Sequence, residues 1–466
     1  MHECGAYMKI ESLQLKHTNL FANLQLQFQY HDQPITLILG DQATGKTSIL
    51  KHAYQALTWF SARYKDLRSA GVVMLDQDIM YSRLQSKVQI SVEIPTDIGT
   101  LAESETAQAE ASNRCSWQLY KTLNQQGIGL SKAETDQLEQ LVQLYHRALQ
   151  QDPMQGLPLI AYYPAERFVN EINLLSKNNP IVFQAAHAYE VAAIPFTTFS
   201  RFFEWFREIS DLENAQTAQL FQQLMRDKLH LGPHLQPENV PNTLFQAHVQ
   251  LHAPCLKALK DSLKILVPEL QDIFVQYQPK LQLIVNYQGK VMQFQQLSSS
   301  QKNWIALIGD IVRRMCLLNP LSLYPCLEGD GVLLIDAIDE QLDQNHCSQI
   351  LQHLHQAFPR LQIIATGNRT ELLENAVAYQ CLQLGPQGVQ DIMLQPLQQQ
   401  FDQIYAELSQ ISLSGAATLE QLSDEPALSA AQQLYAQIQQ LSPEAQTELQ
   451  QLWQQANDSS FKDPSS

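Results

Sequence analysis

A single nine-residue segment constrains the fold of this chain more than any other part of it. The segment matches the Walker A pattern GxxxxGK[ST]. Its residues are Gly40, Asp41, Gln42, Ala43, Thr44, Gly45, Lys46, Thr47 and Ser48. The apolar run 35–39 predicts a buried strand before it, and residues 47–59 predict a helix after it. In that context, backbone N–H groups and a helix N-terminus converge on phosphate oxygens, so we predict that the chain binds a nucleoside triphosphate.

The composition is typical of a folded chain with a large core. The chain has 466 residues, of which 45% are hydrophobic, which allows one core with an insertion or several domains. No apolar run approaches the roughly 18 residues of a membrane span. Residues 1–7 are too short and polar for a signal peptide, and Met8 resembles a natural start. The 7 cysteines are scattered without zinc spacing, which favours reduced thiols and a cytoplasmic protein.

The charge balance bears on nucleic-acid binding. A formal net charge of −17 argues against a uniformly basic surface. Two local groups of basic residues remain, namely Lys257, Lys260 and Lys264 on one predicted helix, and the pair Arg313-Arg314 on another. Solvated helix faces are the first interpretation of both groups, and contacts with a phosphate backbone are the alternative.

Hydrophobic periodicity predicts an α/β fold. The predicted strands are 10–15, 24–28, 35–39, 71–75, 88–94, 157–163, 281–287, 290–294, 332–335 and 361–365. The predicted helical regions are 47–59, 100–151, 199–231, 253–275, 299–318 and 348–358. Strands that alternate with helices imply a largely parallel sheet covered by helices.

Four segments follow from this pattern. We predict an N-terminal lobe with the Walker A loop at 1–100 and a mainly helical insertion at 101–279. A C-terminal lobe at 280–396 and a Gln-rich helical tail at 397–466 complete the chain. The tail has amphipathic spacing at Phe401, Tyr405 and Leu408, so it either packs back on the core or docks a partner.

A second nucleotide-binding motif lies far along the chain. Residues 331–335 are a short apolar strand that delivers the carboxylate of Asp336 to the sheet edge, as a Walker B strand does. We predict that Asp336 and Thr47 together order a bound Mg²⁺ ion. The two motifs together imply that the nucleotide core is split by the insertion.

The segment 297–302 (LSSSQK) leads into the helix at 306–314 and resembles the signature helix of ABC-type ATPase heads. Within these, the chain is most similar to the RecF/SMC-like AAA family ATPases described as predicted ATP-binding proteins involved in virulence. The Septu antiphage ATPase PtuA is a related case. Further matching landmarks are 157–167, 202–214 and 331–366, so the resemblance runs from Met8 to about residue 395.

The resemblance implies a P-loop head that binds ATP and Mg²⁺ and forms a head-to-head homodimer. In such a dimer, ATP lies between one subunit's Walker A loop and the other's signature residues. Those residues here are Ser298, Ser299, Ser300 and Gln301. The resemblance also implies a catalytic glutamate directly after the Walker B aspartate and a histidine at the end of the next strand.

This chain departs from the family at the catalytic positions. Ala337 stands at the glutamate position and Asn368 at the histidine position. Ala337 cannot polarise a water molecule, and loss of a general base costs roughly 10²–10⁴-fold in rate. Ser300 replaces the signature glycine, so its Cβ hinders close approach of the backbone to phosphate.

Further departures fall in two loops. Gln42 and Ala43 replace the usual Asn-Gly of the phosphate loop, and Gln341 and Asp343 replace the histidines of an HLHP-like loop. Lys46, Thr47 and Asp336 are all retained. We therefore expect ATP binding with slow or absent hydrolysis.

Three residues near these motifs have two interpretations each. Asp339 or Glu340 could act as a substitute base, although a structural role in the loop is favoured by their offset from the strand. Gln77 is a candidate for the glutamine that links the γ-phosphate to the helical insertion. An ordinary polar turn residue is the alternative for Gln77.

Two functions fit the sequence. The first is a nucleotide-dependent switch or scaffold for a partner protein such as a nuclease, in phage defence. The second is an active ATPase that acts on DNA in repair or recombination. The missing catalytic residues and the negative charge favour the first.

Overall fold

The computed structural model describes residues 7–101, 113–124, 126–169, 188–189, 199–230, 254–374, 376–385 and 388–392. The chain divides into two compact units, residues 1–393 and 394–466. The predicted tail at 397–466 lies outside the described residues, and the segment boundaries given above stay predictions.

The centre of the first unit is a six-stranded sheet with the order β14-β13-β3-β12-β11-β7. Its strands are β3 (Ile35–Gly40), β7 (Leu159–Tyr163), β11 (Gly331–Ile335), β12 (Leu361–Gly367), β13 (Gln380–Gly385) and β14 (Gly388–Asp391). All neighbouring pairs are parallel except β13 and β14. Strands β11 and β12 are buried along their whole length, as central parallel strands require. The sheet joins β3 to β11 and β12 from much later in the chain, and its edge strand β7 lies within the segment predicted as an insertion.

Two antiparallel sheets accompany the central sheet. The larger has the order β2-β1-β4-β5-β6, and the smaller has the order β10-β9-β8. The strands of the larger sheet are β1 (Lys9–Thr18), β2 (Phe21–Gln27), β4 (Gln85–Glu93), β5 (Arg114–Leu123) and β6 (Gly129–Glu134). Those of the smaller are β8 (Leu270–Gln276), β9 (Gln282–Tyr287) and β10 (Lys290–Gln293). Burial alternates along β4 and β5, so one face of the larger sheet packs against the core.

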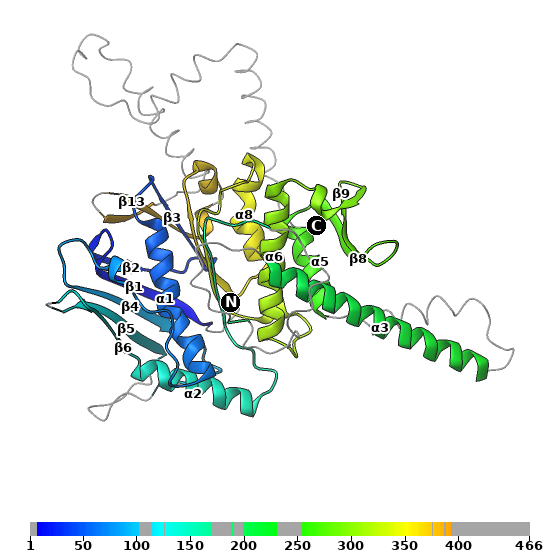
Figure 1. Ribbon diagram of the computed structural model, residues 1–466, viewed down its shortest axis with the longest axis horizontal. Helices are drawn as coiled ribbons and strands as arrows, with labels where there is room; N and C mark the ends of the chain where they lie inside the picture. The colour runs from blue at the N-terminus through cyan, green and yellow to red at the C-terminus, as the bar shows by residue number, and fades with distance from the viewer. Residues whose placement is uncertain are drawn as a thin grey trace, which may run out of the picture. The chain divides into compact units, whose positions relative to one another are not determined.

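The helices join these sheets. They are α1 (Lys46–Lys65), α2 (Asp136–Gln151), α3 (Ser200–His230), α5 (Pro254–Leu266), α6 (Ser299–Leu318), α7 (Pro325–Glu328) and α8 (Gln344–Ala357). Short 3₁₀ turns are η1 (Asp76–Asp78), η4 (Phe294–Gln296), η5 (Thr370–Leu373) and η6 (Ala376–Ala378). Helix α1 contacts strands of the six-stranded central sheet and of the five-stranded antiparallel sheet, and it lies between these two sheets (Figure 1).

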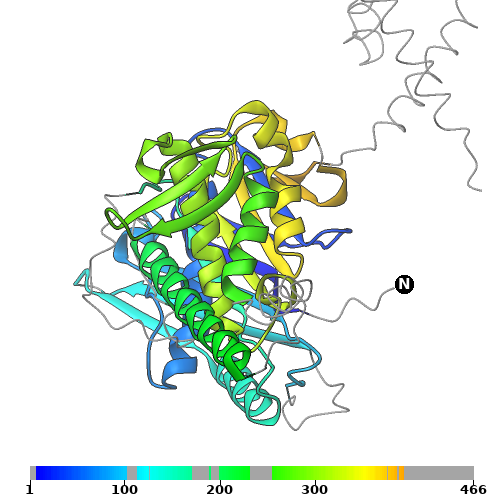
Figure 2. The ribbon, with the colours of Figure 1, turned by 90° about the vertical axis from the view of Figure 1, so that its right-hand side faces the viewer.

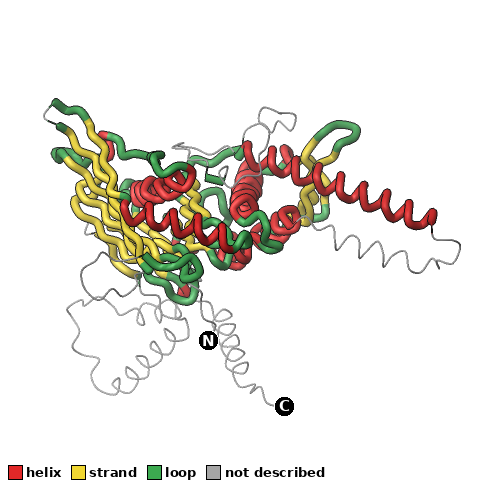
Figure 3. The backbone as a smooth tube through the Cα atoms, turned by 90° about the horizontal axis from the view of Figure 1, so that it is seen from below, coloured by secondary structure: helices red, strands yellow, loops and turns green. Residues whose placement is uncertain are grey.

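Helix α6 is the centre of a second cluster of helices. It packs against α3, α5, α7 and the edge strand β7. Figure 2 shows α3 running past α5, with the small antiparallel sheet close to one end of it. Figure 3 shows the strands of the larger sheets gathered together and the helices alongside them. Gly309 allows α3 to approach α6, because a Cβ at this position would lie 2.2 Å from the Phe202 ring.

Most of the predicted elements are confirmed, but three are wrong. Residues 114–123 and 129–134, which we expected to be helical, form β5 and β6, and among the described residues of 100–151 the helix begins at Asp136. The predicted helix 253–275 ends at Leu266, and β8 occupies its second half. Residues 71–75 belong to no strand. They pair with α1 instead, where the Val72 N–H donates to the Thr58 hydroxyl at 2.9 Å.

Candidate functional site

The phosphate loop connects β3 to α1, as the sequence predicts. Gly45 precedes the helix with φ of 99°, in the left-handed region that favours glycine. A Cβ there would also lie 2.6 Å from the Phe21 ring, so no larger residue fits. The N–H groups of the first turn of α1 have no acidic side chain among them, which leaves this helix end suited to an anion.

The Lys46 ammonium lies over the loop. It donates hydrogen bonds to the carbonyl oxygens of Gly40 and Asp41. Burial lowers the pKa of Lys46, and the nearby carboxylates of Asp336, Asp339 and Asp41 act in the opposite direction. The lysine therefore lies near both the phosphate loop and the end of the Walker B strand.

Thr47 and Asp336 meet across the site. The Thr47 hydroxyl donates to Oδ2 of Asp336 at 2.7 Å, and the Thr366 hydroxyl donates to Oδ1 at 2.5 Å. The Asp336 side chain is buried, with 2% exposure. A hydroxyl and a carboxylate are hard oxygen donors, and Mg²⁺ at nucleotide sites takes few protein ligands together with water and phosphate oxygens. Thr47 and Asp336, called the metal pair below, fit Mg²⁺. The described residues hold no cluster of three or more His, Cys, Asp or Glu for another metal.

Arg167 fixes the backbone behind Asp336. Its guanidinium donates to the carbonyl oxygens of Pro164, Asp336 and Ala337 at 2.9, 2.5 and 2.9 Å. The residue is 9% exposed, and burial lowers the pKa of the guanidinium. This residue was part of a sequence landmark, but its role was not predicted. The sequence signal for Arg167 was its position shortly after the predicted buried strand 157–163, and β7 confirms that strand.

Ala337 and Asn368, which stand at the positions that the resemblance assigns to catalytic residues, have only structural contacts among the described residues. Ala337 has φ of 45°, and its N–H donates to the Thr366 hydroxyl at 2.8 Å. The Asn368 N–H donates to the Asp339 carboxylate at 2.7 Å, and its side chain is exposed. The methyl group of Ala337 therefore provides no acid or base beside the metal pair.

The Asp339 carboxylate is already occupied. Its Oδ2 accepts the N–H groups of Asn368 and Arg369 at 2.7 and 2.8 Å. The residue is 5% exposed, and its Oδ1 has no hydrogen-bond partner. These contacts agree with the structural interpretation of Asp339. Glu340 is exposed, and its N–H donates to the Ala337 carbonyl at 3.2 Å.

The signature segment forms the start of α6. The Ser298 hydroxyl accepts the Gln301 N–H, and the Gln301 side chain accepts the Ser298 N–H, which makes a capping box. The Ser300 hydroxyl donates to the Gln341 carbonyl oxygen, and the Gln341 side chain accepts from Asn303. Ser298 and Ser299 are exposed. The hydroxyl of Ser300 is thus engaged within its own chain.

A cavity of about 860 Å³ opens beside the metal pair. It lies between α1, the segment before η1 and the end of β7. Its polar lining residues are Thr47, Lys51, Gln55, Gln77, Glu166 and Asp336. Gln77 thus faces the same cavity as the metal pair. Pro164, Ala165 and Glu166, which follow β7, also line this cavity, and the role of Gln77 stays a prediction.

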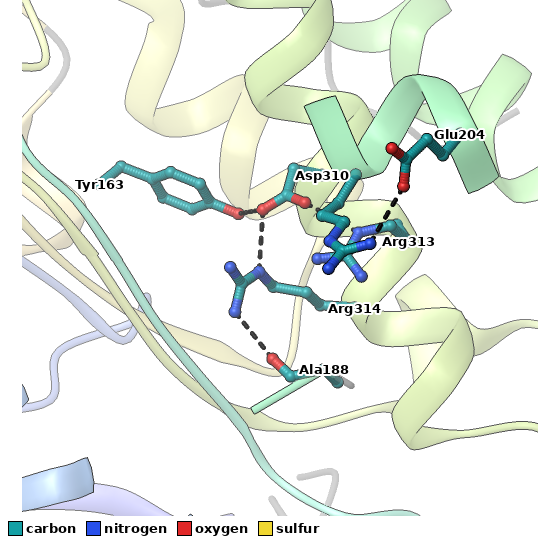
Figure 4. A network of polar contacts seen from close by, with 7 residues as sticks. Tyr163, Ala188, Glu204, Asp310, Arg313 and Arg314 are labelled. Carbon is teal, nitrogen blue, oxygen red and sulfur yellow. Dashed lines mark hydrogen bonds and ion pairs between the residues drawn. The ribbon is translucent and has the colours of Figure 1, made fainter. Parts of the chain in front are cut away.

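A buried ion cluster on α6 is joined to the last residue of β7 (Figure 4). Asp310 accepts from the Tyr163 hydroxyl at 2.9 Å, from Arg313 Nε at 2.9 Å and from Arg314 Nε at 2.8 Å. The two guanidinium groups hold the pKa of Asp310 well below its usual range, although burial acts in the opposite direction. Both predictions for the Arg313-Arg314 pair, a solvated face or a phosphate contact, are wrong, because both side chains are largely buried and pair with Asp310 on the same helix.

The lysines of α5 make contacts within their own chain. Lys260 pairs with Asp272 at 3.0 Å, and the Lys257 ammonium lies 5.7 Å from the centre of the Tyr324 ring. These contacts favour the interpretation of a solvated helix face.

Comparison with known proteins identifies related chains. The profile of the AAA domain family matches residues 12–304. The Retron Vc95 probable ATPase of Vibrio cholerae serotype O1 biovar El Tor is 24% identical over 398 residues, which cover 81% of this chain and 73% of the relative. The Retron Ec83 probable ATPase of Escherichia coli is 24% identical over 404 residues, which cover 79% and 70%.

Solved structures of ATPase heads also align with the chain. An Smc head domain from Pyrococcus furiosus, bound to the C-terminal domain of ScpA, gives a TM-score of 0.45 at 14% identity. The alignment covers 87% of this chain and 100% of that one. The recombination mediator RecF gives a TM-score of 0.38 at 12% identity, over 84% of this chain and 100% of that one.

Proposed function

The chain belongs to the AAA domain family, whose profile matches residues 12–304, and from this premise we propose that it is a nucleotide-dependent switch that hydrolyses ATP slowly. One observation carries the proposal. The Thr47 hydroxyl and the Asp336 carboxylate, which we assign to the metal, lie 2.7 Å apart, while Ala337 has only a methyl group at the position that the resemblance assigns to the general base.

Binding alone can operate such a switch. The phosphate loop and Lys46 hold the triphosphate, and Thr47 and Asp336 hold Mg²⁺. The metal ion neutralises charge on the phosphates when it is bound. A ligand shifts a conformational equilibrium by its different affinity for the two states, and this needs no bond cleavage. Hydrolysis then serves only to reset the switch.

The state favoured by ATP is a homodimer in this proposal. The exposed start of α6 would face the phosphate loop of a second copy, with Ser298, Ser299 and Ser300 toward the nucleotide. For Ser300 to reach a phosphate, its hydroxyl must leave the Gln341 carbonyl. This exchange weakens engagement between the copies and makes it depend on the bound nucleotide.

The biological setting that we propose is phage defence, with a nuclease as a candidate partner. Support comes from the two retron ATPases, which align over most of this chain and most of their own length. The test is to identify the genes that neighbour the gene of this chain, among which we expect one for a reverse transcriptase or an HNH nuclease. A gene that stands alone in several related genomes would contradict this setting.

The biochemical test compares ATP binding with turnover in the purified full chain. We expect saturable binding of ATP with Mg²⁺ and a steady-state rate roughly 10²–10⁴-fold below that of a head with an intact glutamate. Lys46→Ala serves as the control and is expected to lose binding. A turnover rate equal to that of an intact head, abolished by Lys46→Ala, would refute the switch.

A further inference from the structure

The cavity beside the metal pair contains an acidic residue that has no assigned role. Asp336 and Glu166 are the acidic side chains that line it. Asp336 is occupied on both oxygens by Thr47 and Thr366. Glu166 is exposed, and among the described residues no hydrogen bond or ion pair engages its carboxylate. One carboxylate therefore remains unengaged in the cavity that Thr47 and Asp336 also line.

The topology explains why a residue after β7 can serve the position next to Asp336. Strands β7 and β11 are parallel neighbours, with Tyr163 opposite Ile335. The carboxyl ends of parallel strands meet at one edge of the sheet, where ligands bind. Glu166 follows Tyr163 by three residues and the absent glutamate position, Ala337, follows Ile335 by two. The segments that follow β7 and β11 thus leave the sheet at the same edge.

The turn that carries Glu166 is held in place by its neighbour. The Arg167 side chain donates to the carbonyl oxygens of Asp336 and Ala337, so the two strand ends are tied together. The Arg167 carbonyl accepts from the Asn303 side chain at 3.0 Å, which also anchors the turn to α6. These contacts fix the backbone on both sides of the turn, so the position of Glu166 at this edge of the sheet is defined.

The other acidic residues near the site do not have this arrangement. Asp339 is used by the N–H groups of Asn368 and Arg369 and is buried. Neither Asp339 nor Glu340 lines the cavity. Glu340 lies on the exposed loop after Ala337 and is a matched control for a carboxylate outside the cavity.

We infer that Glu166 is the general base for the slow hydrolysis of ATP by this chain. The water oxygen forms a bond to the γ-phosphorus while its proton passes to the Glu166 carboxylate. The bond between the γ-phosphorus and the bridging oxygen breaks, and ADP leaves with the electron pair. The proton then passes from Glu166 to phosphate or solvent. The inference rests on the ATP site proposed above and adds the residue that resets the switch.

The test is single-turnover hydrolysis by Glu166→Gln, with ATP affinity measured on the same protein. We expect the rate to fall about 10²-fold or more, with unchanged affinity, and Glu166→Asp to retain part of the rate. Glu340→Gln is expected to change neither quantity. A second readout is the nucleotide recovered from the protein, which should stay intact ATP for longer in Glu166→Gln than in the parent.

A double variant separates a base from a merely structural residue. Ala337→Glu restores a carboxylate at the family position, so the pair Ala337→Glu with Glu166→Gln should hydrolyse ATP as fast as Ala337→Glu alone. An unchanged rate in Glu166→Gln, lost ATP binding in it, or no hydrolysis in the parent would each overturn the inference. Fast turnover in the parent would refute the slow switch and leave the assignment of Glu166 standing if Glu166→Gln abolishes it.

Discussion

The buried cluster around Asp310 gives a prediction whose size follows from the structure. In Asp310→Asn, the guanidinium groups of Arg313 and Arg314 lose their shared counter-charge. Their side chains are only 5% and 16% exposed, so water cannot replace the carboxylate fully. Removal of one partner from a buried ion pair costs about 3–5 kcal/mol. We therefore expect the free energy of unfolding to fall by about that amount.

Urea denaturation of the parent and the variant measures this difference, with Asp261→Asn on α5 as the matched control. Asp261 is exposed, and the same substitution there is expected to stay within about 0.5 kcal/mol. A loss below about 1 kcal/mol in Asp310→Asn would refute the reasoning, because the buried charges would then be compensated in another way.

The pH dependence provides an independent check of the same cluster. The pKa of Asp310 is depressed in the folded protein, so its carboxylate stabilises the fold above its unfolded pKa. That contribution is lost as the pH falls below the ordinary value of about 3.9 toward the folded pKa. We expect the gap in unfolding free energy between the parent and Asp310→Asn to shrink over this range. A constant gap would contradict the assignment.

Three further predictions concern the nucleotide site. Arg167→Lys cannot serve all three carbonyl oxygens, so we expect a loss of about 1–3 kcal/mol in unfolding free energy and weaker binding of ATP with Mg²⁺, measured by denaturation and calorimetry. Gly45→Ala places a Cβ against the Phe21 ring at a positive φ, so ATP affinity is expected to fall at least about tenfold, in an equilibrium binding assay. Ala337→Glu returns a general base, and steady-state hydrolysis is expected to rise about 10²-fold or more. An unchanged free energy of unfolding in Arg167→Lys, an unchanged ATP affinity in Gly45→Ala or an unchanged hydrolysis rate in Ala337→Glu would contradict the respective prediction.

The parts of the fold that local pattern controls were predictable from the sequence. Strand β11 is a continuous apolar run, and α6 begins at Ser298 with a capping box that the residues Ser298 and Gln301 encode directly. The phosphate loop follows from its spacing and from glycine at a position of positive φ. These features depend on neighbours in sequence, which a reader of the sequence can see.

The errors come from contacts between distant residues. Apolar residues at Cys115, Trp117 and Leu119 alternate with polar ones along β5. We expected a helix in this region, and the pairing with β4 shows that it is a strand. Asp310 meets a tyrosine 147 residues away, so the sequence placed Arg313 and Arg314 on a helix face without showing that they are buried. In the sequence, Glu166 is one acidic residue in a turn, and only the folded structure shows that it lines the same cavity as Asp336. Long-range packing decides such sites.

The nucleotide found on the protein after a brief incubation tests the central claim most directly. Protein in excess over ATP, with Mg²⁺, is quenched after about one second, which suffices for an ordinary ATPase with a turnover of about 10 s⁻¹. The account predicts that nearly all of the bound nucleotide is still ATP, because the rate is lower by roughly 10²–10⁴-fold. Bound ADP, or no bound nucleotide, would contradict it.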